Sequence, residues 1–377
     1  MKKNILIITG EPSGDMRAGE LIRELKEFLP DISFWGIGGD RMRAQNVELI
    51  EHIQHFSLVG AWEVVKNLSR IRRHYKNLIR NIRKRKPDLA ILIDYPGFNL
   101  RVARFLHSEK IPVIYYIIPQ VWAWGRHRLK SLKRFVDKAL VLFKFEEHFL
   151  KQAGIDCEFV GHPLLDNITS SGGPAARSGA FTIALLPGSR KNEILGIFPV
   201  MLEAAEKIHG QRKDVQFVVA ENSNVDKSLY DSALAGHGGL TVSRFTNDTF
   251  TCLDRCDFAM VTSGTATLET AIMEKPMVIV YRAAFLTYVL FRLFMRIPFI
   301  GLANIIAGEE VAPELLQGNC TSEKLYRKVL EITGDDSRMR SMKSKLREVK
   351  RSLGERGASR KAAETISRFI EEKIPAK

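Results

Sequence analysis

Short apolar runs alternate with segments of helical periodicity along most of this 377-residue chain. Continuous apolar strands separated by helices are typical of parallel sheets that are covered on both faces. The alternation therefore predicts an α/β fold built from doubly wound sheets. We expect strands at Asn4–Thr9, Ile32–Gly36, Asp88–Asp94, Pro112–Ile118, Lys138–Leu142, Glu158–Val160, Thr182–Leu186, Val215–Ala220, Phe258–Thr262 and Met277–Tyr281.

Helical patterns fill the intervals between these strands. The first is expected from Asp15 to Leu29, with Asp15 as its N-cap and Pro30 as its stop signal. Further helices are expected near Asn192–Ile208, Thr265–Glu274 and Phe285–Met295.

The chain is long enough for two domains, since domains usually contain about 100–200 residues. Residues 166–180 read DNITSSGGPAARSGA, a composition typical of an exposed linker. We therefore expect one Rossmann-like lobe at 1–165 and a second at 181–320, with a cleft between them. Residues 321–377 are highly charged and predict a helical C-terminal segment that packs back across the first lobe.

Cysteine content and the N-terminal residues indicate an intracellular protein. Four scattered cysteines are too few for a disulfide framework, and Cys252 and Cys256 have no neighbouring pair that would complete a zinc site. The first ten residues have neither the length nor the cleavage site of a secretory signal. No apolar run reaches the roughly 20 residues of a spanning helix. We expect a cytoplasmic protein.

The net charge is +14, and a large part of the excess is concentrated in one segment. Residues 66–86 contain ten basic residues and no acidic residue. Such a field attracts nucleic acid, anionic lipid or a phosphorylated substrate, and charge alone does not choose among them. Because the chain has no helix-turn-helix, RRM or zinc-finger signature, we expect no nucleic-acid partner.

Ligands of open α/β sheets bind beyond the carboxyl ends of the strands, so the loops after strands are the first place to look for a site. After the first strand, GEPSGD at Gly10–Asp15 combines two glycines with a helix start, which suits an anion or sugar hydroxyls. No Gly-Lys-Ser/Thr follows, so this loop is not a Walker loop. A purely structural turn explains it equally well.

A carboxylate, Asp94, stands at the end of the apolar run Leu89–Ile93. Partial desolvation there would raise its pKa and make it a better proton acceptor near neutral pH. The alternative is that Asp94 caps the helix that begins near Asn99 or Leu100. Spacing alone does not separate the two.

The second half offers two further loops, LPGSR at Leu186–Arg190 and SGTATLE at Ser263–Glu269. Exposed N–H groups at a helix N-terminus, threonine hydroxyls and a guanidinium together form a metal-free cradle for a diphosphate. Glu269 could accept hydrogen bonds from a ribose diol, although a glutamate near a helix start more often only compensates the dipole.

Several familiar catalytic signatures are missing from the sequence. It contains no HExxH, no GxSxG and no Asp-x-Asp pair of the kind that holds a metal on a nucleotide diphosphate. We therefore expect no metal and no cofactor.

Seven motifs in order resemble the bacterial lipid-A-disaccharide synthase family and together span residues 10–308. They are GEPSGD at 10–15, IDYPGFN at 93–99, QVWAWGRHR at 120–128, FVGHPLLD at 159–166, LPGSR at 186–190, SGTATLE at 263–269 and NIIAG at 304–308. The resemblance implies an inverting GT-B glycosyltransferase of lipid A biosynthesis. It would transfer 2,3-diacylglucosamine from UDP to the 6-hydroxyl of 2,3-diacylglucosamine 1-phosphate, releasing UDP and the β-1,6-linked lipid A disaccharide 1-phosphate.

The resemblance also implies a division of labour, with the acceptor in the first lobe and the UDP-sugar in the second. Asp94 is then the expected general base, and Glu11, which would orient a sugar, is the second candidate. The expected substrate-binding residues are Ser13, Gly14 and Gln120 in the first lobe, Ser263, Gly264, Thr265, Thr267 and Arg190 around the diphosphate, Glu269 at the ribose and Asn304 at the nucleotide.

The sequence departs from the family pattern at Pro12, where alanine is common, and at Tyr95–Gly97, where some members carry a second acidic residue. We infer no paired-carboxylate role here. The rival hypothesis is another GT-B enzyme of UDP-N-acetylglucosamine, either a peptidoglycan glycosyltransferase or a UDP-sugar epimerase. Such an enzyme should not carry GEPSGD and QVWAWG together.

Acyl-lipid substrates give the basic segment a specific interpretation. An apolar stretch precedes it, so the region suits an anionic bilayer surface, on the inner face of the inner membrane. The alternative is a core-packed helix with a solvated basic face. Phe285–Phe299 is a second candidate lipid contact, and the residues leave open whether the chain forms a homodimer. The apolar stretch contains Leu58, Val59, Ala61, Trp62, Val64, Val65 and Leu68.

Overall fold

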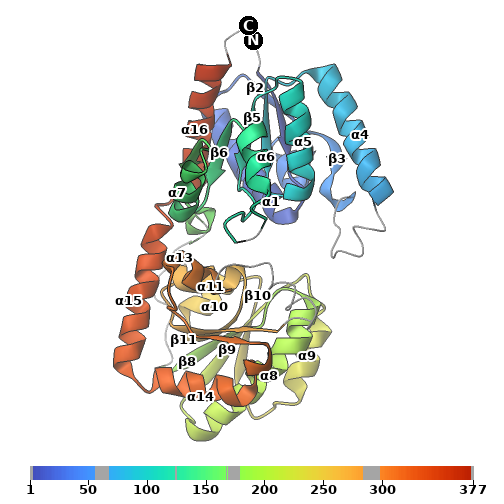
Figure 1. The fold of residues 1–377 in the computed structure, drawn as a ribbon. Helices are drawn as coiled ribbons and strands as arrows, with labels where there is room; N and C mark the ends of the chain where they lie inside the picture. The colour runs from blue at the N-terminus through green and yellow to red at the C-terminus, as the bar shows by residue number, and fades with distance from the viewer. Residues whose placement is uncertain are drawn as a thin grey trace. The chain divides into compact units, whose positions relative to one another are not determined.

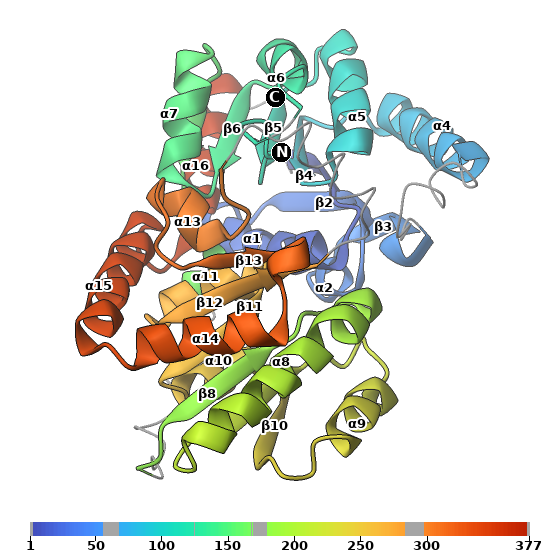
Figure 2. The ribbon, with the colours of Figure 1, turned by 60° about the horizontal axis from the view of Figure 1, so that its bottom comes forward.

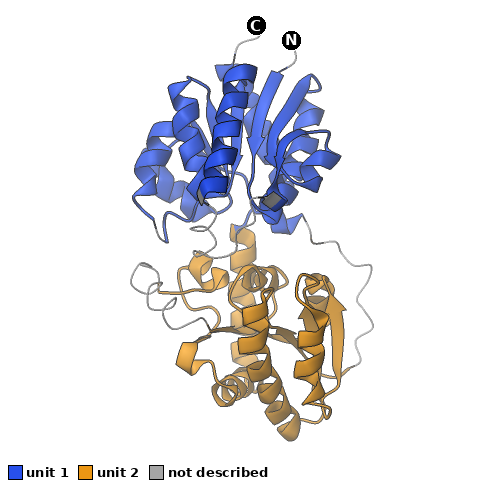
Figure 3. Ribbon diagram, turned by 90° about the vertical axis from the view of Figure 1, so that its right-hand side faces the viewer, with its two compact units in different colours: residues 1–166, 353–377 blue, residues 167–352 orange. Residues whose placement is uncertain are grey.

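The computed structural model describes residues 3–55, 68–123, 125–166, 168, 179–282 and 298–374. The chain divides into two compact units (Figure 3). Unit 1 consists of residues 1–166 and 353–377, and unit 2 of residues 167–352. Each unit carries one parallel sheet flanked by helices (Figure 1), which confirms the predicted α/β class.

The sheet of unit 1 has seven strands in the order β3-β2-β1-β4-β5-β6-β7. All of its strand pairs are parallel. The strands are β1 (Lys3–Ile8), β2 (Ile32–Gly38), β3 (Glu48–His52), β4 (Leu89–Ile93), β5 (Val113–Tyr116), β6 (Lys138–Val141) and β7 (Cys157–Phe159). The helices are α1 (Pro12–Phe28), α2 (Asp40–Ala44), α4 (Leu68–Arg85), α5 (Pro96–Ser108), α6 (Arg128–Phe135), α7 (Lys144–Gln152) and α16 (Ala358–Lys373).

The sheet of unit 2 has six parallel strands in the order β10-β9-β8-β11-β12-β13. They are β8 (Thr182–Leu186), β9 (Gln216–Glu221), β10 (Val242–Thr246), β11 (Phe258–Thr262), β12 (Met277–Tyr281) and β13 (Glu314–Leu316). The helices are α8 (Lys191–Gln211), α9 (Lys227–Ala235), α10 (Thr249–Asp254), α11 (Thr265–Ile272), α13 (Leu302–Ala307), α14 (Ser322–Thr333) and α15 (Asp336–Ser352). Helices α14 and α8 lie side by side (Figure 2).

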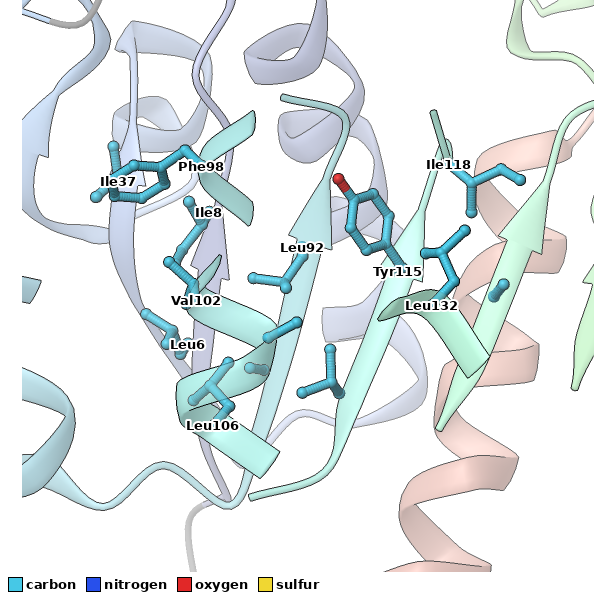
Figure 4. Packing of buried hydrophobic residues seen from close by; sticks show 14 of the residues in the cluster. Leu6, Ile8, Ile37, Leu92, Phe98, Val102, Leu106, Tyr115, Ile118 and Leu132 are labelled. Carbon is cyan, nitrogen blue, oxygen red and sulfur yellow. The ribbon is translucent and has the colours of Figure 1, made fainter. Parts of the chain in front are cut away.

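Burial on both faces explains why the central strands were predictable. Ile5–Ile8 of β1 and Leu89–Ile93 of β4 are completely buried, as the continuous apolar runs require. One face of the unit 1 sheet packs against α4, α5 and α6, where Leu92 and Tyr115 meet Val102 and Leu106 (Figure 4). On the other face, α1 packs against α16.

Three strands were not predicted, and each lies at the edge of a sheet. Strands β3, β10 and β13 have only one neighbouring strand each, and most of their residues are partly exposed. Edge strands do not need continuous apolar runs, because solvent reaches one of their sides. Their sequences, ELIEH, VSRFT and ELL, therefore lack the signal used above.

The segment 321–377 is divided between the two units. Helices α14 and α15 belong to unit 2, and only α16 belongs to unit 1. There it packs on α1, and Arg360 pairs with Glu27 at 3.1 Å.

The predicted cap of the first helix is wrong. Helix α1 begins at Pro12 with Glu11 at its N-cap position, so Asp15 lies inside the first turn. The buried Asp15 carboxylate instead accepts hydrogen bonds from the backbone N–H groups of Gly39, Arg41 and Met42 at 2.7, 2.9 and 3.2 Å. It therefore ties α1 to the start of α2. The predicted helix Phe285–Met295 lies outside the described residues.

Candidate active site

The strand order of each sheet marks one crevice. In unit 1 the chain passes from β1 outward to β2 and β3, then returns to place β4 on the other side of β1. Unit 2 repeats this with β8 and β11. At such a switch point the two following loops diverge, and ligands of doubly wound sheets bind between them. The loops in question carry Glu11 and Asp94 in unit 1, and Arg190 and Gly264 in unit 2.

Asp94 and Glu11 are electrostatic neighbours at the unit 1 crevice. Asp94 directly follows β4 and is half-buried, whereas Glu11 is exposed. Burial raises the pKa of the Asp94 carboxyl to about 6; the Glu11 carboxylate adds to the rise and the Tyr95 N–H partly opposes it. Asp94 does not cap the following helix, since α5 begins at Pro96 and its N-cap position is Tyr95. The helix-cap alternative is thus excluded, and Asp94 can serve as a proton acceptor near neutral pH.

Gly10 brings the two loops together. A Cβ at this position would lie 2.4 Å from the Tyr95 ring, closer than any side chain tolerates. The glycine therefore lets the loop that carries Glu11 pass directly over Tyr95, the residue after Asp94. Beyond it, Ser13 is exposed in the first turn of α1, and Gly14 is buried against Thr9.

Gln120 is exposed in the loop after β5, the strand that pairs with β4. A residue that the sequence analysis missed holds this loop. Glu146, buried at the start of α7, accepts hydrogen bonds from Trp122 Nε1 at 2.9 Å and from the Leu142 N–H at 3.3 Å. Burial raises the pKa of Glu146 to about 7. Trp122 and Glu146 are 24 residues apart in the sequence, so no local sequence pattern could indicate that they form a hydrogen bond.

In unit 2 the start of α11 lies directly after β11, at the switch point of the sheet. Gly264 is its N-cap with φ 150° and ψ −158°, a conformation that is almost restricted to glycine. Gly264 and Thr265 are exposed. The first N–H groups of a helix have no intrahelical partner and carry the positive end of the dipole, so this exposed helix start suits an anionic ligand.

Ser263 and Thr267 build this loop with their side chains. Ser263 Oγ donates to the Ile300 carbonyl oxygen at 3.0 Å. Thr267 Oγ1 donates to the Gly264 carbonyl oxygen at 2.8 Å and accepts from the Leu302 N–H at 3.1 Å. Both hydroxyls thus fasten residues 300–302 to the loop, a role that spacing in the sequence does not reveal.

Asn304 is completely buried, and protein groups occupy its hydrogen-bonding capacity. Its Nδ2 donates to the Ala312 carbonyl oxygen at 2.7 Å and to Glu314 Oε1 at 2.9 Å. Its Oδ1 accepts from the N–H groups of Val311 and Ala312, each at 2.9 Å. In this conformation Asn304 supports the loop beside α11 and offers no remaining polar group to a nucleotide.

Glu314, which the sequence analysis also missed, completes this support. Its carboxylate accepts from the N–H groups of Ile300 and Gly301 at 3.0 and 2.9 Å. The residue lies in the edge strand β13, ten positions beyond Asn304.

The Arg190 guanidinium pairs with Glu193 Oε1 at 3.4 Å. The Arg190 side chain is 75% exposed. Its backbone N–H and that of Ser189 donate to Glu193 Oε2 at 3.2 and 2.9 Å, which fixes the loop at the start of α8. Glu269 is half-buried in the second turn of α11. Among the residues that the structure describes, no group of three or more acidic, histidine or cysteine side chains could hold a metal ion.

No helix within the described ranges is both long enough and apolar enough to span a membrane.

Several solved structures have the same fold as this chain. A calicheamicin glycosyltransferase matches with a TM-score of 0.63 at 14% identity, covering 99% of this chain and 100% of its own. A Neisseria meningitidis UDP-GlcNAc 2-epimerase bound to UDP-GlcNAc matches with a TM-score of 0.62 at 11% identity, covering 98% and 100%. Two parallel α/β units of this kind define the GT-B glycosyltransferase fold.

Sequence comparison gives the family. The family model described as lipid-A-disaccharide synthetase matches residues 5–370. The lipid-A-disaccharide synthase of Myxococcus xanthus is 39% identical over 373 residues, which is 97% of this chain and 97% of the relative. A relative of the same name from Anaeromyxobacter is 38% identical over 371 residues, or 96% of each chain. The chain belongs to the lipid-A-disaccharide synthetase family.

Proposed function

We propose that this chain is an inverting glycosyltransferase that transfers 2,3-diacylglucosamine from UDP to the 6-hydroxyl of 2,3-diacylglucosamine 1-phosphate. The products are lipid A disaccharide 1-phosphate and UDP. The observation that carries the proposal is the Asp94 carboxyl at the unit 1 switch point, with its pKa raised to about 6 in a chain of this family.

Unit 1 supplies the base in this mechanism. The Asp94 carboxylate takes the proton of the acceptor 6-hydroxyl while that oxygen forms a bond to the anomeric carbon of the donor. A pKa near 6 leaves Asp94 ionised at neutral pH yet basic enough to accept a proton. Glu11 and Gln120 hydrogen-bond sugar hydroxyls beside it.

Unit 2 stabilises the leaving group. The bond between the anomeric carbon and the diphosphate oxygen breaks, and both of its electrons leave with UDP. The exposed N-terminus of α11 at Gly264 and Thr265, together with the Arg190 guanidinium, binds that developing negative charge. Glu269 accepts hydrogen bonds from the ribose, and Ser263, Thr267 and Asn304 keep the loop in shape.

A product assay tests this function. The purified chain is incubated with both proposed substrates, with and without EDTA, and the products are identified by mass spectrometry. We expect the disaccharide phosphate and UDP in equal amounts, with EDTA having no effect. Conversion of UDP-N-acetylglucosamine to an epimer, or release of UDP without acceptor, would favour the rival enzyme classes instead.

Nucleotide binding should depend on Arg190 and Glu269. We expect Arg190→Ala and Glu269→Ala each to weaken UDP binding by roughly 1.5–3 kcal/mol, the cost of one charge-assisted contact. Calorimetric titration of UDP measures this. Arg255→Ala and Glu203→Ala, which remove exposed charges elsewhere in unit 2, are the controls. If all four variants bind UDP like the parent chain, the nucleotide lies elsewhere.

We further propose that the protein is cytoplasmic and binds peripherally to the inner face of the inner membrane through the basic face of α4. Helix α4 has a second, apolar face, and its residues Leu78 and Ile82 are buried in the unit 1 core. That apolar face is therefore not available to lipid. Arg83 and Arg85 pair with Glu109 and Glu48. Outward-facing, exposed basic residues remain at Arg70, Arg72, Arg73, Lys76, Arg80 and Lys84. Residues 58–65 of the apolar stretch and most of Phe285–Phe299 lie outside the described residues.

Vesicle binding tests the α4 proposal. Each basic side chain near an anionic bilayer contributes up to about 1 kcal/mol, less after screening by salt. The chain should therefore sediment with anionic vesicles at low salt and detach as salt rises. Binding should fall when glutamine replaces Arg70, Arg72, Arg73 and Lys76.

The matched control removes the same charge from unit 2, with glutamine at the exposed Lys213, Arg340, Lys343 and Arg351. Equal binding by both quadruple variants would show that only net charge matters, and α4 would not be the contact.

A further inference from the structure

The peptide that carries Asp94 has an unfavourable backbone conformation. Asp94 and Tyr95 are consecutive left-handed residues, with φ of 46° and 50°. Aspartate tolerates this region moderately well, but a bulky aromatic residue such as tyrosine rarely enters it. Two such residues in succession persist only where the surroundings hold them.

Two buried side chains hold this turn through the Asp94 carbonyl oxygen. The Tyr115 hydroxyl donates to that oxygen at 2.7 Å, and Asn99 Nδ2 donates to it at 2.7 Å. Asn99 Nδ2 also donates to the Ile93 carbonyl oxygen at 3.1 Å. Tyr115 and Asn99 are both completely buried, so water cannot replace either donor.

The donors come from two different elements. Tyr115 lies on β5, beside β4, and Figure 4 shows its ring on the helix-covered face of the sheet with the hydroxyl toward the carboxyl ends of the strands. Asn99 lies in the first turns of α5. Burial raises the pKa of the Tyr115 hydroxyl well above its usual value of 10, so it remains a donor.

The backbone therefore determines where the Asp94 carboxylate points. If the carbonyl oxygen loses its donors, the turn can relax and φ of Asp94 can change from 46° toward the common right-handed region. Rotation about the N–Cα bond of Asp94 carries its Cα–Cβ bond with it and turns the side chain away from its place beside Glu11. Neither Tyr115 nor Asn99 needs to touch a substrate for this effect.

We propose that Tyr115 and Asn99 are positioning residues for the transfer reaction, which fix the carboxylate of Asp94 by holding its carbonyl oxygen in a left-handed turn. This inference rests on the proposed role of Asp94 as the base.

Tyr115→Phe tests the proposal, because it removes one hydroxyl and keeps the ring in the core. Its matched control is Tyr116→Phe, which removes the hydroxyl of the next residue on the same strand. Tyr116 is equally buried, but the charges that act on its hydroxyl come from Arg17, Glu20 and Asp166 rather than Asp94. Thermal unfolding of both variants measures the change in stability separately from the change in kcat, because only the Tyr115 hydroxyl donates to the Asp94 carbonyl oxygen.

We expect Tyr115→Phe to lower kcat by about 10–100-fold and to leave KM for both substrates within about twofold, since the base is misplaced and binding is not. Tyr116→Phe should keep kcat within about twofold. Asn99→Ala should also lower kcat, as Tyr115→Phe does. In an Asp94→Asn background, where there is no base to position, Tyr115→Phe should change kcat less than about twofold.

Two outcomes overturn the proposal while leaving Asp94 as the base. Either Tyr115→Phe retains the kcat of its control, or it lowers kcat as much in the Asp94→Asn background as in the parent chain. A fully active Asp94→Asn variant is a different result, because it refutes the proposed base itself.

Discussion

Asp94→Asn should lower kcat by about 10²–10⁴-fold, the usual contribution of a positioned general base, and leave UDP binding nearly intact. Asparagine has nearly the same shape but cannot accept the proton. Steady-state kinetics with saturating substrates and calorimetric titration of UDP measure the two parts. Asp31→Asn, an exposed aspartate of unit 1, is the control. Turnover within about threefold of the parent chain would remove Asp94 from the mechanism and direct attention to Glu11.

The same carboxyl fixes the pH profile of the reaction. With the pKa of Asp94 at about 6, the active ionised form is present above that pH. The parent chain should lose kcat/KM as the pH falls through about 6, and the residual activity of Asp94→Asn should lack this acid limb.

The stability of the folded chain should respond to pH in the opposite direction to the activity. The pKa of Asp94 is raised from 3.8 to about 6 on folding, so ionisation is less favourable in the folded state. This group therefore lowers stability as the pH rises from about 4 to about 6, and the loss persists at pH 7. At pH 7 the free energy of unfolding of Asp94→Asn should thus exceed that of the parent chain by up to about 3 kcal/mol. Urea denaturation measures this difference as a higher midpoint concentration. A less stable Asp94→Asn variant would contradict the raised pKa.

Asn304→Ala should lower the free energy of unfolding by about 3–5 kcal/mol, because it leaves the Val311 and Ala312 N–H groups and the Ala312 carbonyl oxygen without their partners in the interior. Urea denaturation measures the loss. UDP affinity should fall only as far as the loop beside α11 loosens.

Asn222→Ala serves as the comparison, since Asn222 is partly exposed and its side chain accepts only from the Asn224 N–H. If Asn304→Ala instead keeps full stability and loses UDP binding, then Asn304 contacts the nucleotide directly and the network described above rearranges on binding.

The positions of the site loops were predictable, and the function of individual side chains in them was less so. The central strands are completely buried, so they appear in the sequence as continuous apolar runs. The loops after β1, β4, β8 and β11 then follow from where those runs end. Asp94 could be selected because a lone carboxylate after an apolar strand is conspicuous in the sequence.

Roles set by contacts between distant segments could not be read in this way. Ser263 and Thr267 were expected to offer hydroxyls to a diphosphate, but residues 300–302 occupy those hydroxyls. Asp15 was expected to cap its own helix and instead holds the start of α2, 24 residues away. Glu146 and Glu314 gave no signal, because their partners come from other loops.

Unit 1 is discontinuous, and this has a consequence for synthesis on the ribosome. Its sheet is complete at residue 166, but α16, which covers part of α1, lies within residues 353–377. The apolar side chains of α1 that α16 covers thus stay uncovered while all 186 residues of unit 2, from 167 to 352, are translated. Since domains fold largely in the order of synthesis, unit 1 is the first part of the protein to be made and the last to be completed. Until the final helix packs on it, part of its apolar surface is exposed to solvent.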